Sequence, residues 1–255
     1  MATEADAEAE TEAKATPGPT ETLVDRILPS RARIPEQPPA GNYVVIDVTH
    51  FSTTVVELFE NGAEYVHVTE NRGDEHAYKD EYPEAKIGGG SSADYTPTEG
   101  YDFFNSPSYV QTVDVDGQPT AMTSTNGGAA VTDLRLRGGD DVTVYVGGLC
   151  NAAAVAAHLA DSDDPTYLVA AGSKGKPSPE DVVGALVIGR HIYGDPPGAS
   201  ERLVYQEIAH LAKAPKYEQK ADIRLNDLVE YDLRFSESAV VPKLDGQKLR
   251  DVGDA

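Results

Sequence analysis

The sequence predicts a three-layer α/β fold in which helices cover both faces of a mostly parallel β-sheet. Three observations lead to this prediction. Short runs of β-branched residues alternate along the chain with segments of helical length, which is the pattern of βαβ units. The clearest run, Tyr43–Val48, is almost continuously apolar, which indicates a strand buried on both faces. Several runs end in turns rich in Ser, Thr, Asn and Gly, the residues that favour helix starts.

In the first half of the chain, strands and helices are predicted in alternation. The Tyr43–Val48 strand is followed by a helix over Val55–Gly62, because this segment closes with Asn-Gly, a common helix C-cap. Tyr65–Val68 is predicted to be the next strand, and Glu70–Tyr82 a polar helix. Residues 88–108 are rich in Gly, Pro, Ser, Asp and Tyr, so we expect them to wrap over a site.

The second half repeats the pattern more regularly. Strands are predicted at Thr120–Thr123, Asp141–Val146, Thr166–Ala171 and Ala239–Val241, and helices at Ala129–Leu136, Ala152–Leu159, Glu180–Tyr193 and Ser200–Leu211. The alternation of these elements again favours parallel strands connected by helices.

The N-terminal residues differ in composition from the rest. Residues 1–20 alternate alanine with acids and end in a Pro/Gly-rich stretch, a composition that cannot bury a core. We expect them to form a disordered acidic tail, and residues 21–255 to form one α/β domain. A division of this domain into two lobes near residues 110–120 is the alternative. Leu23–Leu28 is expected to add an early strand or helix, and the proline-rich residues 29–41 an extended lead-in.

Acidic residues dominate the charge of the chain. It carries 43 Asp and Glu against 21 Lys and Arg, a formal net charge of −22, and most of the excess lies outside the tail. Repulsion of this size destabilises a compact protein in dilute buffer, whereas molar salt shortens the Debye length to about 3 Å and screens it. The composition therefore predicts a protein adapted to high salt, and an ordinary acidic protein is the alternative.

The same composition argues against several classes of partner. No basic stripe is present to neutralise phosphates, so we expect no nucleic-acid partner. No run of 18 apolar residues and no secretory signal pattern occurs, so we expect no membrane association and a cytoplasmic location. Cys150 is the single cysteine, which fits a reducing compartment, and its context favours a small buried hydrophobe over a nucleophile. A homodimer is the assembly that we consider.

Four turns are candidates for a ligand site, because ligands of open α/β sheets bind beyond the carboxyl ends of the strands. These turns are residues 47–54, 124–128, 147–151 and 172–181. Each places small hydroxyl or amide side chains at a helix start, where free N–H groups and the helix dipole favour an anion. Helix capping alone explains any one of them, but the four together predict an anion site of the phosphate type.

Charged side chains in these turns are the candidates for chemistry. Asp47 follows the first strong strand, where a carboxylate can hold Mg²⁺ or attack phosphorus, and a helix-capping role is the alternative. Glu180 and Asp181 begin a helix, which by itself also explains two acids there. Lys174 can neutralise phosphate charge, and His50 can contact an anion or protonate a leaving group.

Taken in order, these motifs resemble those of the 2-phosphosulfolactate phosphatase family. The resemblance rests on Asp47–Thr54, Phe104–Pro107, Ser124–Gly128, Asn151–Ala156, Ala170–Asp181 and Val240–Pro242. It implies an α/β phosphatase that depends on Mg²⁺ and hydrolyses a small anionic phosphomonoester such as 2-phosphosulfolactate.

The turns and the resemblance together assign roles to particular side chains. Asp47, Glu180 and Asp181 are expected to be catalytic, with Mg²⁺ held by Asp47 and Asp181. The residues expected to bind substrate or phosphate are His50, Ser52, Thr53, Thr54, Asn105, Ser124, Thr125, Asn126, Gly127, Asn151 and Lys174.

The sequence also departs from the family pattern. His50 stands where the family has Arg, Gly89 where Glu is common, and Ala170 where the family has Cys. Loss of the Arg removes a bidentate grip on phosphate or sulfonate. A second hypothesis is therefore a non-catalytic anion-binding or regulatory relative with a degenerate site.

Overall fold

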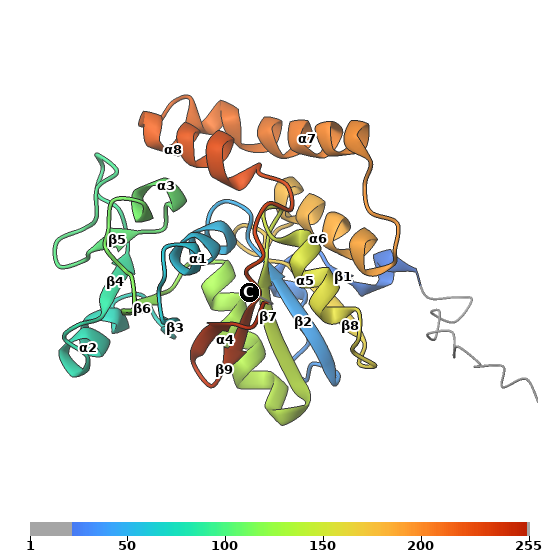
Figure 1. Cartoon of the computed structure of the whole chain (residues 1–255), viewed down its shortest axis with the longest axis horizontal. Coiled ribbons are helices and arrows are strands. Elements are labelled where there is room, and N and C mark those ends of the chain that lie inside the picture. The colour runs from blue at the N-terminus through green and yellow to red at the C-terminus, as the bar shows by residue number, and fades with distance from the viewer. Residues whose placement is uncertain (1–21, 254–255) are drawn as a thin grey trace, which may run out of the picture.

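Within residues 22–253, which the computed structural model describes, a mixed sheet of ten strands organises the fold and helices cover both of its faces (Figure 1). The acidic tail predicted at 1–20 lies outside the described residues. The strands are β1 (Ile27–Leu28), β2 (Gly41–Ile46), β3 (Tyr65–Val68), β4 (Lys86–Gly89), β5 (Phe103–Phe104), β6 (Pro119–Met122), β7 (Val142–Gly147), β8 (Thr166–Ala170), β9 (Pro242–Asp245) and β10 (Lys248–Asp251). The α-helices are α1 (Phe51–Glu60), α2 (Asp74–Glu81), α3 (Pro107–Val110), α4 (Gly127–Gly138), α5 (Ala152–Leu159), α6 (Pro179–Ile192), α7 (Ala199–Tyr217) and α8 (Asp222–Asn226).

The sheet consists of two parallel groups joined by an antiparallel hairpin. Its strand order is β1-β8-β2-β7-β9-β10-β3-β6-β4-β5. The first four strands of this order pair in parallel, and so do the last four. Between the two groups, β9 pairs antiparallel with β7, and β10 pairs antiparallel with both β9 and β3. The predicted α/β fold with a mostly parallel sheet is confirmed.

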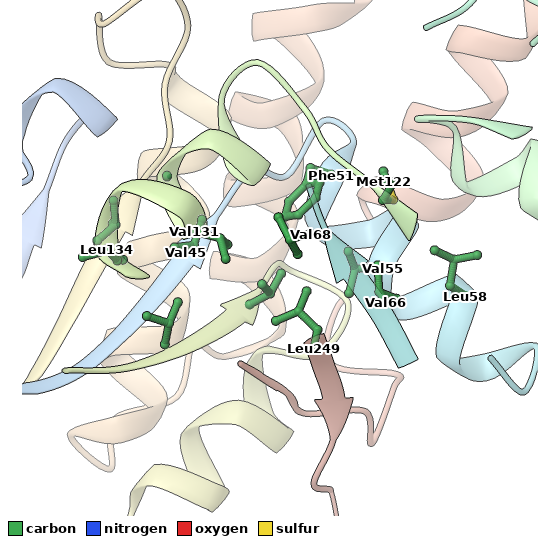
Figure 2. Packing of buried hydrophobic residues seen from close by; sticks show 14 of the residues in the cluster. Val45, Phe51, Val55, Leu58, Val66, Val68, Met122, Val131, Leu134 and Leu249 are labelled. Atoms are coloured by element: carbon green, nitrogen blue, oxygen red, sulfur yellow. The ribbon is translucent and has the colours of Figure 1, made fainter. Parts of the chain in front are cut away.

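The strand β2 shows why its sequence is apolar at consecutive positions. Side chains alternate across a strand, so Tyr43 and Val45 point to one face and Val44 and Ile46 to the other. The first pair packs in a cluster with side chains of α1 and α4 (Figure 2), and the second pair packs with those of α5 and α6. All four side chains are fully buried. Helices therefore form a layer on each face of the sheet.

Two sequence predictions differ from the structure near the ends of elements. The helix predicted from Val55 begins at Phe51, so that residues 52–54 form its first turn, with the Ser52 N–H donating to the Asp47 carbonyl at 2.9 Å. The strand predicted at Ala239–Val241 is wrong, because pairing starts only at Pro242.

The hairpin β9–β10 was missed because most of its residues are charged. Its apolar positions are Leu244, which is half-buried, and Leu249, which is fully buried. The two strands are joined by the two-residue turn Gly246-Gln247, in which Gly246 has a φ of 60° that glycine adopts without strain.

The helices α7 and α8 lie across one end of the sheet instead of along a face (Figure 1). α7 packs on α6, and a π-helical turn at Asp227–Asp232 follows α8 and packs against α3 and α7. No helix within residues 22–253 is long and apolar enough to cross a membrane.

Candidate active site

Asp47 is fixed at the N-terminus of α4. Its Oδ2 accepts a hydrogen bond from the N–H of Gly127, the first residue of α4, at 2.9 Å. Its own N–H donates to the Ser52 hydroxyl at 3.0 Å. A Cβ at position 127 would lie 2.8 Å from the Asp47 Cβ, so only glycine allows this approach. The positive end of α4 therefore faces a buried carboxylate.

The contact between Asp47 and Gly127 joins the two groups of strands. Asp47 follows β2, whereas Gly127 follows β6, whose group runs in the opposite direction through the hairpin. Strands twist by about 20–25° relative to their neighbours, so the five steps from β2 to β6 accumulate a rotation of about 100°. In a flat sheet β2 and β6 would point in opposite directions. Because of this rotation, their carboxyl ends can lie close together.

Asp181 ties two strand ends together. Its Oδ1 accepts from the N–H of Val48, and its Oδ2 from the N–H of Gly172, both at 2.9 Å. Val48 follows β2 and Gly172 follows β8, so the carboxylate holds the two loops at a fixed separation. Burial, together with the charges of Asp47 and Glu180, raises the pKa of Asp181 well above its ordinary value. Both of its oxygens are engaged by the backbone.

Glu180 connects this group to α7. Its Oε1 forms an ion pair with the Lys213 Nζ at 2.7 Å, whereas its Oε2 is buried without a hydrogen-bond partner. Burial opposes the charge of Lys213, but Glu180, Asp181 and Asp47 raise its pKa above the ordinary value. Burial raises the pKa of Asp47 to about 6, although the Gly127 N–H and Lys213 act in the opposite direction. The site thus combines three carboxylates with one half-buried ammonium group.

His50 is paired with Asp232, which is not among the site residues predicted from the sequence. Its Nδ1 lies 2.6 Å from the Oδ2 of Asp232, and its ring stacks on Tyr217 with centroids 5.3 Å apart. Burial and the Arg224 guanidinium lower the pKa of His50 to about 3, while burial and Asp227 raise the pKa of Asp232 well above its usual range. The His50 imidazole is therefore uncharged near neutral pH and brings no positive charge to the position where the family resemblance predicts arginine.

Most of the predicted hydroxyl and amide side chains shape the turns. Thr53 donates to the Val48 carbonyl at 3.1 Å, and the Ser124 hydroxyl accepts from the Gly128 N–H at 2.8 Å. Asn151 accepts from the Gly148 N–H and donates to the Val240 carbonyl.

Two of the predicted hydroxyl and amide side chains keep a buried polar atom without a hydrogen-bond partner within residues 22–253. These atoms are the Thr54 Oγ1 and the Asn105 Oδ1. Neither has a role in holding its turn, so both are available to a ligand.

Thr125, Asn126 and Lys174 line one cavity. Its volume is ≈ 400 Å³, and Arg31 and Arg137 contribute to its wall. Thr125 and Asn126 immediately precede Gly127, so this cavity begins next to the residue that holds Asp47. The predicted residues are thus divided between a buried acidic group at the strand ends and a cationic cavity beside it.

The C-terminal helices contribute residues to the site that were not predicted from the sequence. Lys213, Lys216 and Lys220 lie at the end of α7 and just after it, and Arg224 and Asp232 follow on α8 and the π-helical turn. A signal was present, because basic residues recur here at intervals of three or four in a chain with half as many bases as acids.

The carboxylates of the site suit a divalent cation that takes only one or two of its ligands from the protein. Within residues 22–253, no group of three or more His, Cys, Asp or Glu side chains is arranged to hold a metal ion. Mg²⁺, however, is commonly held by only one or two carboxylates, with water and substrate phosphate completing its coordination. The orphaned Glu180 Oε2 and the Asp47 carboxylate suit such a set, whereas Asp181 already binds two backbone N–H groups.

Comparison of the chain with known proteins identifies similar proteins and a matching family. The family model described as 2-phosphosulpholactate phosphatase matches residues 29–244. Proteins named "Probable 2-phosphosulfolactate phosphatase" from Clostridium botulinum (strain Eklund 17B / Type B) and Clostridium beijerinckii are 28% and 25% identical to the chain, each over 81% of it and 90% of their own length. A protein of the same name from Deinococcus radiodurans is 33% identical over 58% of the chain and 60% of its own length.

Proposed function

The chain belongs to the 2-phosphosulfolactate phosphatase family, a family of phosphoric monoester hydrolases, and from this premise we propose that it hydrolyses a small anionic phosphomonoester to an alcohol and phosphate with the help of Mg²⁺. The substrate is 2-phosphosulfolactate or a close analogue. The observation that carries the proposal is the buried Asp47 carboxylate, held by the start of α4 beside the ion pair of Glu180 and Lys213.

Each of these groups has a task that matches its surroundings. Phosphoryl transfer requires mainly positioning and neutralisation of charge, because little covalent chemistry is left to the protein. Lys213 remains protonated and offsets negative charge on the phosphoryl group. The backbone N–H groups of Thr125 and Asn126, just before α4, are the donors left for its oxygens, because those of Gly127 and Gly128 already bind Asp47 and Ser124. Asp181 fixes the loops that carry these groups.

The metal belongs to the same arrangement. Bound Mg²⁺ would be held by Asp47 and Glu180, and it would neutralise charge on the transferring phosphoryl group. Without a divalent cation, two carboxylates would face a phosphate anion, so activity is expected to require one.

The proposal is tested by measuring phosphate release from 2-phosphosulfolactate and a panel of phosphomonoesters, with Mg²⁺ or with a chelator, in molar KCl. High salt suits the acidic body of the protein, which we propose works in a salt-rich cytoplasm. We expect turnover that depends on Mg²⁺ and falls at least a hundredfold in Asp47→Asn. Asp163→Asn is the matched control, because Asp163 is exposed and precedes β8, at the opposite end of that strand from the site. Full activity of Asp47→Asn would remove Asp47 from the mechanism.

The second hypothesis, an anion-binding relative without turnover, is decided by the same samples. The uncharged His50 at the position where the family resemblance predicts arginine favours it. Thermal stabilisation by phosphate or sulfolactate, without hydrolysis of any phosphoester in the panel, would support it and contradict the phosphatase.

A further inference from the structure

A row of cations crosses the end of α7. Lys213, Lys216, Lys220 and Arg224 are spaced by three or four residues along the end of α7, the following turn and α8. The whole chain has 43 acids and 21 bases, so four bases within twelve residues run against its overall composition. Such a row indicates a local requirement for positive charge.

Aromatic rings place two of these cations, Lys220 and Arg224, beside the site. The Lys220 Nζ lies 5.4 Å from the ring centroid of Tyr95 and 5.3 Å from that of Tyr217. The Arg224 guanidinium carbon lies 5.3 Å from the same Tyr95 ring. Tyr217 in turn stacks on His50, so Lys220 is separated from the buried site by a single ring. Cation–π contacts of this kind hold a charged group at the edge of an apolar surface.

The two ends of the row have carboxylate partners, and its middle does not. Lys213 pairs with Glu180 at 2.7 Å, and Arg224 pairs with Asp227 at 3.1 Å. Neither Lys216 nor Lys220 forms an ion pair with a carboxylate in the described part of the chain. Burial, followed by the charges of Lys220 and Lys213, lowers the pKa of Lys216. Like charges brought together without acids are the usual arrangement for binding an anion.

A second segment adds positive charge near this row of cations. The charge of Lys174, in the loop after β8, also lowers the pKa of Lys216. Lys174 lines the cavity that begins beside Gly127. The positive charge of α7 therefore continues into the cavity lined by Thr125 and Asn126, the two residues before α4. His50, being neutral and bound to Asp232, adds nothing to it.

We propose that Lys216 and Lys220 form a second anion subsite, which binds the carboxylate or sulfonate group of the substrate and selects phosphoesters that carry such a group next to the phosphate. This inference rests on the proposed phosphatase activity. In this proposal the cations have different roles. Lys213 neutralises the phosphoryl group, whereas Lys216 and Lys220 hold the non-reacting part of the molecule.

A matched pair of substrates tests the selectivity. 2-Phospholactate and isopropyl phosphate have the same branched shape, and the first has a carboxylate where the second has a methyl group. The measurement is the ratio of kcat/KM for the two esters in wild type, Lys216→Gln, Lys220→Gln and Lys220→Arg. The control is Lys248→Gln, because Lys248 also lies over a tyrosine ring, Tyr65, but outside the site.

We expect wild type to prefer 2-phospholactate, and each glutamine variant to lower this preference about tenfold, the usual effect of losing one charged hydrogen bond. Lys220→Arg keeps the charge and should keep most of the preference, and Lys248→Gln should leave it unchanged. Equal losses for both esters in the glutamine variants, or no loss, would overturn the subsite.

Binding of a molecule without phosphate distinguishes failure of the subsite from failure of the proposed function. Sulfoacetate carries a sulfonate and a carboxylate, and its affinity is measured by isothermal titration calorimetry at modest ionic strength. If wild type hydrolyses no phosphoester yet binds sulfoacetate about tenfold more tightly than Lys220→Gln, the subsite stands and the phosphatase proposal falls. If phosphoesters are hydrolysed but both proteins bind sulfoacetate equally, the subsite falls alone.

Discussion

Replacing Asp47 by asparagine should stabilise the fold at neutral pH while it removes a carboxylate that we propose takes part in catalysis. The carboxylate is buried, and burial raises its pKa from 3.8 to about 6. An asparagine side chain has nearly the same shape, and its carbonyl oxygen can still accept the hydrogen bond from the Gly127 N–H. The substitution therefore removes the cost of burying a charge and keeps the packing.

The size of the effect follows from the pKa. A rise of about two units corresponds to about 3 kcal/mol, because each unit is worth about 1.4 kcal/mol. The folded-state pKa lies above the unfolded one, so the folded protein binds the additional proton between about pH 4 and about pH 6. Asp47 consequently costs nothing below about pH 4, and its full cost is reached above about pH 6. For a protein of this length, about 3 kcal/mol raises the melting temperature by about 6–12 °C.

The assay is thermal unfolding, followed by circular dichroism, of wild type and Asp47→Asn at a series of pH values from about 4 to about 8. The stability gain should be largest at neutral pH and should vanish at the acidic end. It should also persist in molar KCl, because salt screens surface charges but not the desolvation of a buried group. Asp163→Asn is again the control, since Asp163 is exposed and should show a smaller effect that salt removes.

Two results would refute the reasoning. A variant less stable than wild type at every pH would mean that the Asp47 carboxylate stabilises the fold through its contacts. A gain that does not change with pH would mean that protonation of Asp47 is not its cause.

Three further outcomes are expected. Lys213→Met should lower stability by about 3 kcal/mol, measured by urea unfolding, because it leaves Glu180 buried without its partner, and adding Glu180→Gln should recover part of the loss. Cys150 is fully buried and burial raises its pKa to about 12, so a disulfide reagent at mildly alkaline pH should modify it only after unfolding, and rapid labelling of the native protein would contradict its burial. The melting temperature of wild type should rise as KCl increases from about 0.1 M to about 1 M, because the Debye length shortens from about 10 Å to about 3 Å while the net charge stays at −22, and a flat response would argue against salt adaptation.

Much of the fold could be predicted because it depends on local patterns. The apolar run at Tyr43–Ile46 reflects burial on both faces of β2, and the alternation of strands and helices reflects the parallel groups. The hairpin β9–β10 escaped prediction because its pairing with β7 and β3 supplies the stability that its charged sequence lacks. Pairing between distant segments leaves little trace in either segment.

The candidate site shows the same division. The sequence by itself determined which turns begin helices, and therefore that Asp47, Gly127 and Asp181 occur where N–H groups are free to bind carboxylates or anions. Only the tertiary structure decided that α7 covers these turns, that Lys213 pairs with Glu180, and that His50 is buried in contact with Asp232. Those contacts join residues far apart in the chain, and their energies depend on burial and on distance, which no local pattern of amino acids specifies.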